Sequence, residues 1–399
     1  MKIKAVRVER EGGGARLVGE IERAGGVTAE VWFEYGPDYA DFVREDADVF
    51  IPLCLSGSML EGEPLETDLP VSAKMAHELH RLRDVLSVWF PATMKRIEIR
   101  IPNAVAKPPN EANAAGLFFS AGVDAYYSLM MASEGLRHEY APLKYLIYMR
   151  GLEAPLSRAV GDKLDRVVRI GSDLGCPVIT GRTNLREVFD YEYMPYVCGP
   201  ALAGVGLSLS RGLSEVRIAT GTSYAASEFR GGSTGFLIDR LRSTEYLYIE
   251  KDGGEARRSE KVEFLVNYPY VLENLSVCTR NLGAWDNCGV CPKCVRTMIS
   301  LQALGALEKC PSLPSPFDYR LIRTVQLKGF VEKYMLRANL ALAERTGRDP
   351  KLVKKLRRHI WRHEKYRALA DLVANTPLHP PARWLRQFVK DHFGPGRRT

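Results

Sequence analysis

From Ala114 onward, the chain alternates short apolar segments typical of buried strands with segments typical of helices. The strand-like segments read GLFFS, LKYLIYM, CPVITG and EVRIATG. Strands that alternate with helices at this spacing form a parallel sheet covered on both faces. The sequence therefore predicts an α/β fold with a doubly wound parallel sheet over residues 114–310. In such sheets, ligands bind beyond the carboxyl ends of the strands.

Two further regions flank this α/β segment. Residues 1–106 contain three alternating strand-like segments and an amphipathic helix over about 70–89, and the linker-like segment KPPNEAN follows. They predict a small α+β domain. Residues 311–399 hold two long amphipathic stretches, which predict a helical, basic extension.

The formal net charge of +8 is concentrated near the C-terminus. Residues 351–399 carry 13 Lys and Arg against 3 acids, a sum of +10, so the rest of the chain sums to −2. Such a segment binds nucleic acid, an acidic protein or anionic lipid, or is simply a solvated helix face. Nucleic acid and protein are the candidate partners, and a homodimer is a further candidate.

Apolar residues make up 46% of the chain and charged residues 26%, which is ordinary for a soluble globular protein. No stretch is long and apolar enough to span a bilayer, and no secretory leader follows Met1. We therefore expect a cytoplasmic protein with no membrane partner.

Four of the eight cysteines fall within 17 residues, in the segment CTRNLGAWDNCGVCPKC; they are Cys278, Cys288, Cys291 and Cys294. Four thiolates with two-residue spacers are typical of a closed tetrahedral zinc site. An iron–sulfur cluster is the alternative, since it also takes four cysteines. We expect structural Zn²⁺ in a zinc knuckle over residues 278–294, with no open coordination position and no catalytic role.

The first predicted strand of the α/β segment leads directly into SAGVDA at the start of a helix. A glycine-bearing turn at a helix start presents backbone N–H groups to an anion, and the helix dipole adds positive charge there. Ser120 would donate a hydroxyl hydrogen bond, Gly122 would allow close approach, and Asp124 would hold Mg²⁺. The alternative is a capped helix start without a ligand.

SAGVDA resembles the Ser-Gly-Gly-x-Asp-Ser signature of the PP-loop ATP pyrophosphatases, which cleave ATP to AMP and pyrophosphate. The resemblance implies a sheet of the HUP type and an ATP-binding loop formed by Ser120, Ala121, Gly122, Val123 and Asp124. Ala121 stands where the signature has its first glycine, which is a mild change if its backbone keeps a negative φ. Ala125 replaces the last serine and removes a hydroxyl that would bond a phosphate, at a cost of about 1.5–3 kcal/mol.

With the cysteines following this loop, residues 114–305 resemble the 7-cyano-7-deazaguanine synthase (QueC) family. That family uses ATP to activate the carboxylate of 7-carboxy-7-deazaguanine, which ammonia then converts to an amide and a nitrile. The resemblance implies an ATP-dependent, AMP-forming C–N ligase that uses Mg²⁺. It also assigns Lys261 and Arg296 to catalysis, as cations that neutralise the developing pyrophosphate. The alternative for each is a surface salt bridge.

Polar residues after two other predicted strands are further candidates for cofactor binding. Asn184 follows the third strand, and Thr222 and Ser223 follow the fourth. Asp239, in GGSTGFLIDR, is interpreted as an exposed loop residue rather than a Mg²⁺ contact.

Three functions fit these observations. The first is a diverged deazaguanine-type enzyme that adenylates a related acid, with an acceptor that could be a macromolecule; relatives of this type also occur in bacterial antiviral gene clusters. The second is a PP-loop RNA-modifying enzyme that adenylates a base for thiolation, with the basic segment holding RNA. The third is a partner-binding or ATP-binding module whose phosphate loop is weakened by Ala125.

Overall fold

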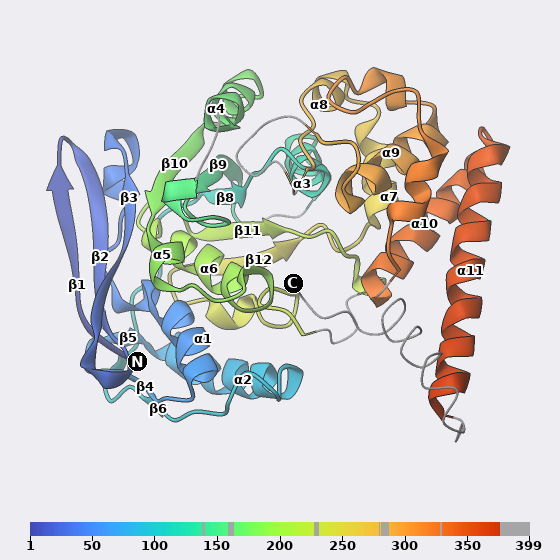
Figure 1. Cartoon of the computed structure of the whole chain (residues 1–399). Helices are drawn as coiled ribbons and strands as arrows, with labels where there is room; N and C mark the ends of the chain where they lie inside the picture. The colour runs from blue at the N-terminus through green and yellow to red at the C-terminus, as the bar shows by residue number, and fades with distance from the viewer. Residues whose placement is uncertain are drawn as a thin grey trace. The chain divides into compact units, whose positions relative to one another are not determined.

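The computed structural model describes residues 1–137, 140–158, 163–226, 231–278, 280, 287–327 and 329–375. Contacts within the chain divide it into two compact units. Within the described residues, the first unit comprises 1–220 and 231–254, and the second comprises 221–226, 255–278, 280 and 287–375. Figure 1 labels helices and strands of both units.

The first unit is built on a ten-stranded sheet in the order β12-β11-β8-β9-β10-β3-β2-β1-β4-β6, and a separate two-stranded sheet pairs β5 with β7. The strands are β1 (Lys2–Glu11), β2 (Gly14–Glu22), β3 (Thr28–Tyr35), β4 (Leu65–Thr67), β5 (Val71–Ser72), β6 (Ile99–Arg100), β7 (Ala104–Val105), β8 (Ala115–Phe118), β9 (Leu143–Arg150), β10 (Val178–Thr183), β11 (Glu215–Ala219) and β12 (Tyr248–Asp252).

Five neighbouring strands, β12, β11, β8, β9 and β10, are all parallel. Along the chain, β8 is followed by β9 and β10 on one side, after which the chain crosses to β11 and β12 on the other side. The order of the strands therefore reverses between β8 and β11, which is where ligands bind in open sheets of this kind. The predicted α/β class with a large parallel sheet is confirmed.

The three N-terminal strands continue the same sheet. β1, β2 and β3 form an antiparallel meander, and β3 pairs antiparallel with β10 through Gly181–Tyr35, Arg182–Glu34 and Thr183–Phe33. Residues 1–106 thus share one sheet and one compact unit with the parallel strands. The domain boundary expected at 106–114 falls inside this unit.

Side chains on the solvent face reinforce the junction between β2, β3 and β10. Glu34 lies between Arg16 and Arg182 in the strand register, and both guanidinium groups donate to its carboxylate. Arg16 also lies 4.8 Å above the ring of Trp32. Opposite charges directly across strands stabilise a sheet pairing, so this row helps to fix the register.

Helices cover both faces of the parallel strands (Figure 1), with α3 and α4 on one face and α6 and α1 on the other. The helical elements of the first unit are η1 (Ala24–Gly26), η2 (Pro37–Phe42), η3 (Ala47–Val49), α1 (Ile51–Glu61), α2 (Ala73–Trp89), α3 (Val123–Ser133), η4 (Leu156–Arg158), α4 (Lys163–Asp173), α5 (Leu185–Val188), the π-helix η5 (Tyr193–Val197), α6 (Cys198–Ser208) and η7 (Arg240–Arg242). A continuous core joins β3, α1 and α6 through fully buried side chains such as Phe33, Leu55 and Leu207.

The second unit is helical in its described part. Its elements are η6 (Tyr224–Ala226), α7 (Arg258–Leu265), α8 (Pro269–Glu273), α9 (Pro292–Leu304), η8 (Leu307–Lys309), η9 (Tyr319–Thr324), α10 (Phe330–Thr346) and α11 (Pro350–Asn375). α10 packs against α7, α9 and α11. Fully buried leucines at 336, 352 and 356 lie on the facing sides of α10 and α11.

Most of the predicted strands are confirmed, and the differences arise from long-range contacts. β12 was not predicted from the sequence, although it extends the parallel sheet beyond β11. The helix expected over about 156–174 is instead the short η4 and the separate helix α4, with residues between them outside the described set. None of the helices in the described residues is long and apolar enough to cross a membrane.

Candidate phosphate-binding loop and metal centre

The SAGVDA segment connects β8 to α3, at the carboxyl edge of the parallel strands and at the reversal of strand order. Ser120 is exposed, Ala121 is fully buried, and Gly122 is the N-cap of α3 with φ −86° and ψ 167°. Among the described residues, no side chain caps this helix start. A helix start presents its first backbone N–H groups away from the helix, which is the arrangement that the phosphate-loop hypothesis requires.

Ala121 has a positive φ, so its replacement of the signature glycine is not the mild change that a negative φ would make it. Its φ is +57°, and among the described residues it is the one non-glycine residue with a positive φ. The left-handed region costs a residue with a Cβ roughly 1–2 kcal/mol. The condition of a negative φ is therefore not met, because the turn from β8 into α3 imposes the backbone shape that glycine adopts freely.

The first two turns of α3 carry the remaining polar groups of the loop. Asp124 is half-buried in the first turn, where the helix dipole favours a negative charge. Ser128 follows four residues later, on the same face of the helix. It is only 2% exposed, and within the described structure its Oγ has no hydrogen-bond partner. Ala125 is also buried and offers no polar group.

Asn184, a predicted cofactor contact, is instead engaged by a neighbouring strand. Its Oδ1 accepts a hydrogen bond from the Trp32 backbone at 2.9 Å, and its Nδ2 donates to the Glu30 carbonyl at 2.8 Å. Both contacts lie on β3, which pairs with β10 just before Asn184. The side chain therefore ties β10 to β3, and nothing in this geometry supports a role in cofactor binding.

Ser223 and Asp239, two other polar residues singled out from the sequence, also have structural partners. The hydroxyl of Ser223 is buried and hydrogen-bonds that of Tyr334 on α10, within the second unit. Thr222 beside it is half-buried. Asp239 is fully buried and pairs with Arg242 at 2.9 Å, so its interpretation as an exposed loop residue is wrong.

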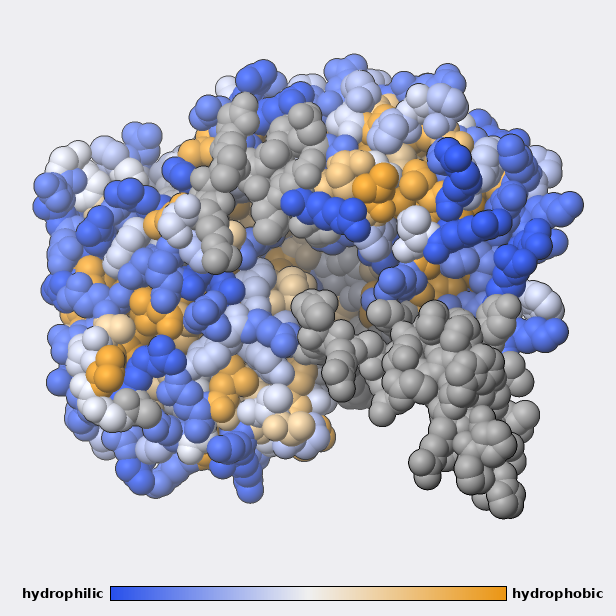
Figure 2. Space-filling model, viewed as in Figure 1, coloured by the Kyte–Doolittle hydropathy of each residue, from blue (hydrophilic) through white to orange (hydrophobic). Residues whose placement is uncertain are grey.

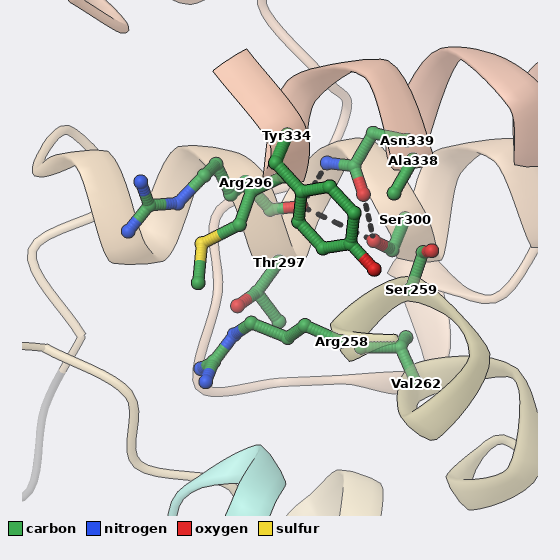
Figure 3. Close-up of a pocket in the computed structure, with 10 residues that line it drawn as sticks. Arg258, Ser259, Val262, Arg296, Thr297, Ser300, Tyr334, Ala338 and Asn339 are labelled. Carbon is green, nitrogen blue, oxygen red and sulfur yellow. Dashed lines mark hydrogen bonds between the residues drawn. The ribbon is translucent and has the colours of Figure 1, made fainter. Parts of the chain in front are cut away.

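Lys261 and Arg296 both belong to the second unit. Lys261 lies on α7 and is 0% exposed, which rules out the alternative of a surface salt bridge. Arg296 lies on α9 and lines a small cavity of about 10 Å³, room for one water molecule. Arg258, which sequence reasoning missed, lines the same cavity. In Figure 3 the two arginines extend toward the same side, from α9 and α7.

Polar side chains hold the cavity together on its other side. Asn339 on α10 donates through Nδ2 to the Arg296 carbonyl at 2.9 Å, and its Oδ1 accepts from Ser300 at 2.8 Å. These dashed contacts in Figure 3 join α9 to α10. The cavity therefore has a cationic side and a side made of satisfied hydrogen bonds.

The four clustered cysteines converge on one point of the second unit. The Sγ atoms of Cys278, Cys288, Cys291 and Cys294 all lie within 4.8 Å of one another, with 3.4 Å between Cys291 and Cys294. Four sulfurs bound to one zinc ion at about 2.3 Å are separated by about 3.8 Å. The group could therefore hold one metal ion such as zinc, whereas the core of an iron–sulfur cluster would separate the thiolates further.

Backbone N–H groups and a helix start prepare these thiols for a cation. Cys291 is the N-cap of α9 and accepts from the Cys294 N–H at 3.5 Å, while Cys288 accepts from the Cys291 N–H at 3.2 Å. Without a metal, burial and then the neighbouring Cys291 raise the pKa of the Cys294 thiol. A bound cation reverses this by stabilising the thiolate, so metal binding releases protons.

Asn287, next to Cys288, is a positioning residue that sequence reasoning missed. Its Oδ1 accepts from the backbone N–H groups of Val277 at 2.7 Å and Cys278 at 3.0 Å. Its Nδ2 donates to the Leu275 carbonyl and the Ser312 hydroxyl, both at 2.9 Å. The Asn287 side chain thus fixes the backbone at Cys278 beside the segment that carries Cys288.

No protein-family model, curated protein or solved structure matches the chain. The family resemblance therefore rests on the motifs in the sequence.

Proposed function

We propose that this protein is an ATP-dependent, AMP-forming enzyme that adenylates a carboxylate, 7-carboxy-7-deazaguanine or a related acid, and then joins it to ammonia or another amine. The observation that carries the proposal is the loop between β8 and α3. It lies at the carboxyl edge of the sheet where strand order reverses, and its second residue has the φ of +57° that a glycine in the signature would supply.

The residues of this loop have distinct roles in the proposed reaction. The backbone N–H groups at the start of α3 and the Ser120 hydroxyl would hold the phosphates, and Asp124 would hold Mg²⁺. The orphaned Ser128 hydroxyl on the same helix face supports a polar ligand near Asp124. ATP supplies the leaving pyrophosphate as the acid's oxygen bonds to the α-phosphorus; the amine then displaces AMP from the acyl carbon.

The cations of the second unit are a separate part of the proposal. Arg296 and Arg258 line one cavity and remain candidates for binding an anion. Lys261 is fully buried, so its proposed contact with phosphate would require a movement that exposes its ammonium group. We assign zinc to the four cysteines as a structural ion, because a closed set of four thiolates leaves no site for catalysis.

A second candidate function is an ATP-binding or partner-binding module without turnover. Ala125 favours it, since this buried residue cannot supply the hydroxyl of the family signature. Losing one hydrogen bond to a charged group weakens binding by about 1.5–3 kcal/mol.

ATP turnover with Mg²⁺ tests the proposal, with AMP and pyrophosphate measured separately from ADP. The assay is run with and without 7-carboxy-7-deazaguanine plus ammonia. We expect AMP and pyrophosphate in equal amounts, and their loss in Asp124→Asn. Asp165→Asn is the matched control, because Asp165 is an exposed acid in the first turn of α4. ATP binding that depends on Asp124 without AMP would favour the ATP-binding module, whereas the absence of both ATP binding and AMP would contradict the adenylating enzyme and the ATP-binding module.

A further inference from the structure

The outward face of α11 combines cations with one aromatic ring. Seven Lys and Arg and one Glu occur between residues 351 and 365. At helical spacing, six exposed residues fall on a single face, which we call the basic stripe: Lys351, Lys354, Arg358, Trp361, Arg362 and Lys365. The stripe contains no acid.

The opposite face of α11 fixes the orientation of this stripe. Leu352 and Leu356 are fully buried, Ile360 is 8% exposed, and His359 hydrogen-bonds the Val325 carbonyl through Nε2 at 2.9 Å. The helix therefore packs its apolar side on its own unit. In Figure 2, hydrophilic side chains in blue gather along the right-hand side of the view, where Figure 1 shows α11.

The charge of the stripe is not neutralised by the described part of the chain. The nearby acids Glu344 and Glu364 pair with Arg357 and Arg337, which lie outside the stripe. No ion pair within that same described part involves the five stripe cations. Five uncompensated charges over about 21 Å of helix create a strong positive potential.

We infer that the basic stripe binds single-stranded nucleic acid. Its cations recur every three or four residues, about 4.5–6 Å along the helix, which is comparable to the separation of neighbouring phosphates on an extended strand. Trp361 lies among them with 58% of its surface exposed, and Lys365 Nζ lies 5.0 Å from its ring. An exposed aromatic ring between cations is the arrangement on which unpaired bases stack.

Two other partners fit the stripe less well. A helix that lies in a membrane interface inserts an apolar face, but the apolar face of α11 over residues 352–360 is already buried against its own unit. A duplex keeps its bases stacked inside, so it would use the cations and leave Trp361 without a role. This inference does not depend on the proposed adenylating activity.

Fluorescence anisotropy with the full chain tests the inference. The probes are labelled single-stranded RNA and DNA of about 20 nucleotides, the matching duplex, and vesicles containing phosphatidylserine. Removing three phosphate contacts should lower the slope of log K against log salt by about 2, and weaken binding about 100-fold at about 100 mM salt. We therefore expect Lys354→Gln/Arg358→Gln/Arg362→Gln to show both changes.

A charge-matched control distinguishes an effect of the basic stripe on binding from an effect of the protein's total charge. Arg169→Gln/Lys309→Gln/Arg323→Gln removes three exposed cations elsewhere on the chain, and it should bind like the unaltered protein. Trp361→Ala should weaken single-strand binding about 5-fold or more with an unchanged salt slope, and leave duplex binding unaffected. Circular dichroism checks that each variant is folded.

Three results would overturn the inference. They are no binding to single strands by the unaltered protein at low salt, equal losses in the stripe and control triples, and a stripe that binds the anionic vesicles in preference to the oligonucleotides.

Discussion

The Oδ1 atom of Asn287 lies 3.0 Å from the backbone nitrogen of Cys278, so the side chain preceding the second cysteine holds the first. Partners that orient metal ligands typically change metal affinity 10–100-fold when they are removed. Asn287→Ala should therefore weaken zinc binding by about this factor, measured by competition with a chromophoric chelator. Asn287→Asp keeps the acceptor for both N–H groups and should recover part of the affinity.

Asn267→Ala is the control for this measurement, since the Asn267 side chain donates to the Phe264 carbonyl at the exposed end of α7. The thiolate charge-transfer band of the Co²⁺-substituted protein gives a second readout. A band that is unchanged in Asn287→Ala, together with unaltered affinity, would refute the positioning role.

The cysteine cluster predicts one metal ion per chain. Elemental analysis should find one equivalent of zinc, and Cys291→Ser should lose it because three thiolates no longer close the tetrahedron. Cys310→Ser is the matched control: Cys310 is also buried, but it contacts Ser312 and stands outside the cluster. Equal zinc loss in both variants would contradict the assignment of ligands.

Chelation should destabilise the second unit, because metal binding contributes free energy to folding. Thermal unfolding in the presence of a strong chelator should therefore begin at a lower temperature. Cys310→Ser should show the same decrease as the unaltered protein, while Cys291→Ser should be insensitive to the chelator.

The left-handed Ala121 predicts a stabilising substitution. Ala121→Gly relieves about 1–2 kcal/mol of backbone strain and removes a buried methyl group worth about 0.8 kcal/mol, so the unfolding free energy should rise by about 0.2–1.2 kcal/mol. Urea denaturation measures this change. Ala132→Gly, within α3, should change stability in the opposite direction by about 1 kcal/mol. A loss of stability in Ala121→Gly would show that the methyl packing dominates.

The buried Asp48 predicts a pH dependence of stability. Burial, and then the charge of Asp46, raise the pKa of Asp48 to about 6, and Lys107 at 2.9 Å opposes this only in part. As the pH rises, Asp48 in the unfolded state loses its proton near a pKa of about 3.9, whereas in the folded state it keeps the proton up to about pH 6. The resulting stability is present below pH 4 and is lost as the pH rises through 6.

Asp48→Asn removes this titration. The unfolding free energy of the variant minus that of the unaltered protein should increase from pH 4.5 to pH 7, by at most about 3 kcal/mol. Urea denaturation at the two pH values measures the difference. Asp68→Asn, on an exposed side chain, should show no such trend. A pH-independent difference for Asp48→Asn would contradict the raised pKa.

Local patterns predicted the strands β1, β2, β3, β8 and β9, because the alternation of apolar and polar residues and short apolar runs are features of a few consecutive residues. The cysteine cluster was equally accessible, since ligand spacing is itself a sequence feature. The pairing of β3 with β10 was not predictable in this way. It depends on which edge of a finished sheet is free, and no local pattern specifies this.

The polar residues show the same limit at the candidate site. Asn184, Ser223 and Asp239 were of suitable chemical type for ligand contacts, yet each has a structural partner. Asn184 contacts β3, Ser223 contacts Tyr334, and Asp239 pairs with Arg242, three residues along the chain. Whether a polar side chain is free for a ligand depends on tertiary neighbours. The sign of φ at Ala121 was likewise a property of the completed turn.

The junction between β3 and β10 also has a consequence for synthesis of the chain. Glu34 and Arg182, which face each other across this junction, are 148 residues apart. At about 5–20 residues per second, a ribosome needs roughly 7–30 s to make the intervening segment. During that time the outer edge of β3 has no partner strand, so the newly made N-terminal meander is open to pairing with other nascent chains until β10 arrives.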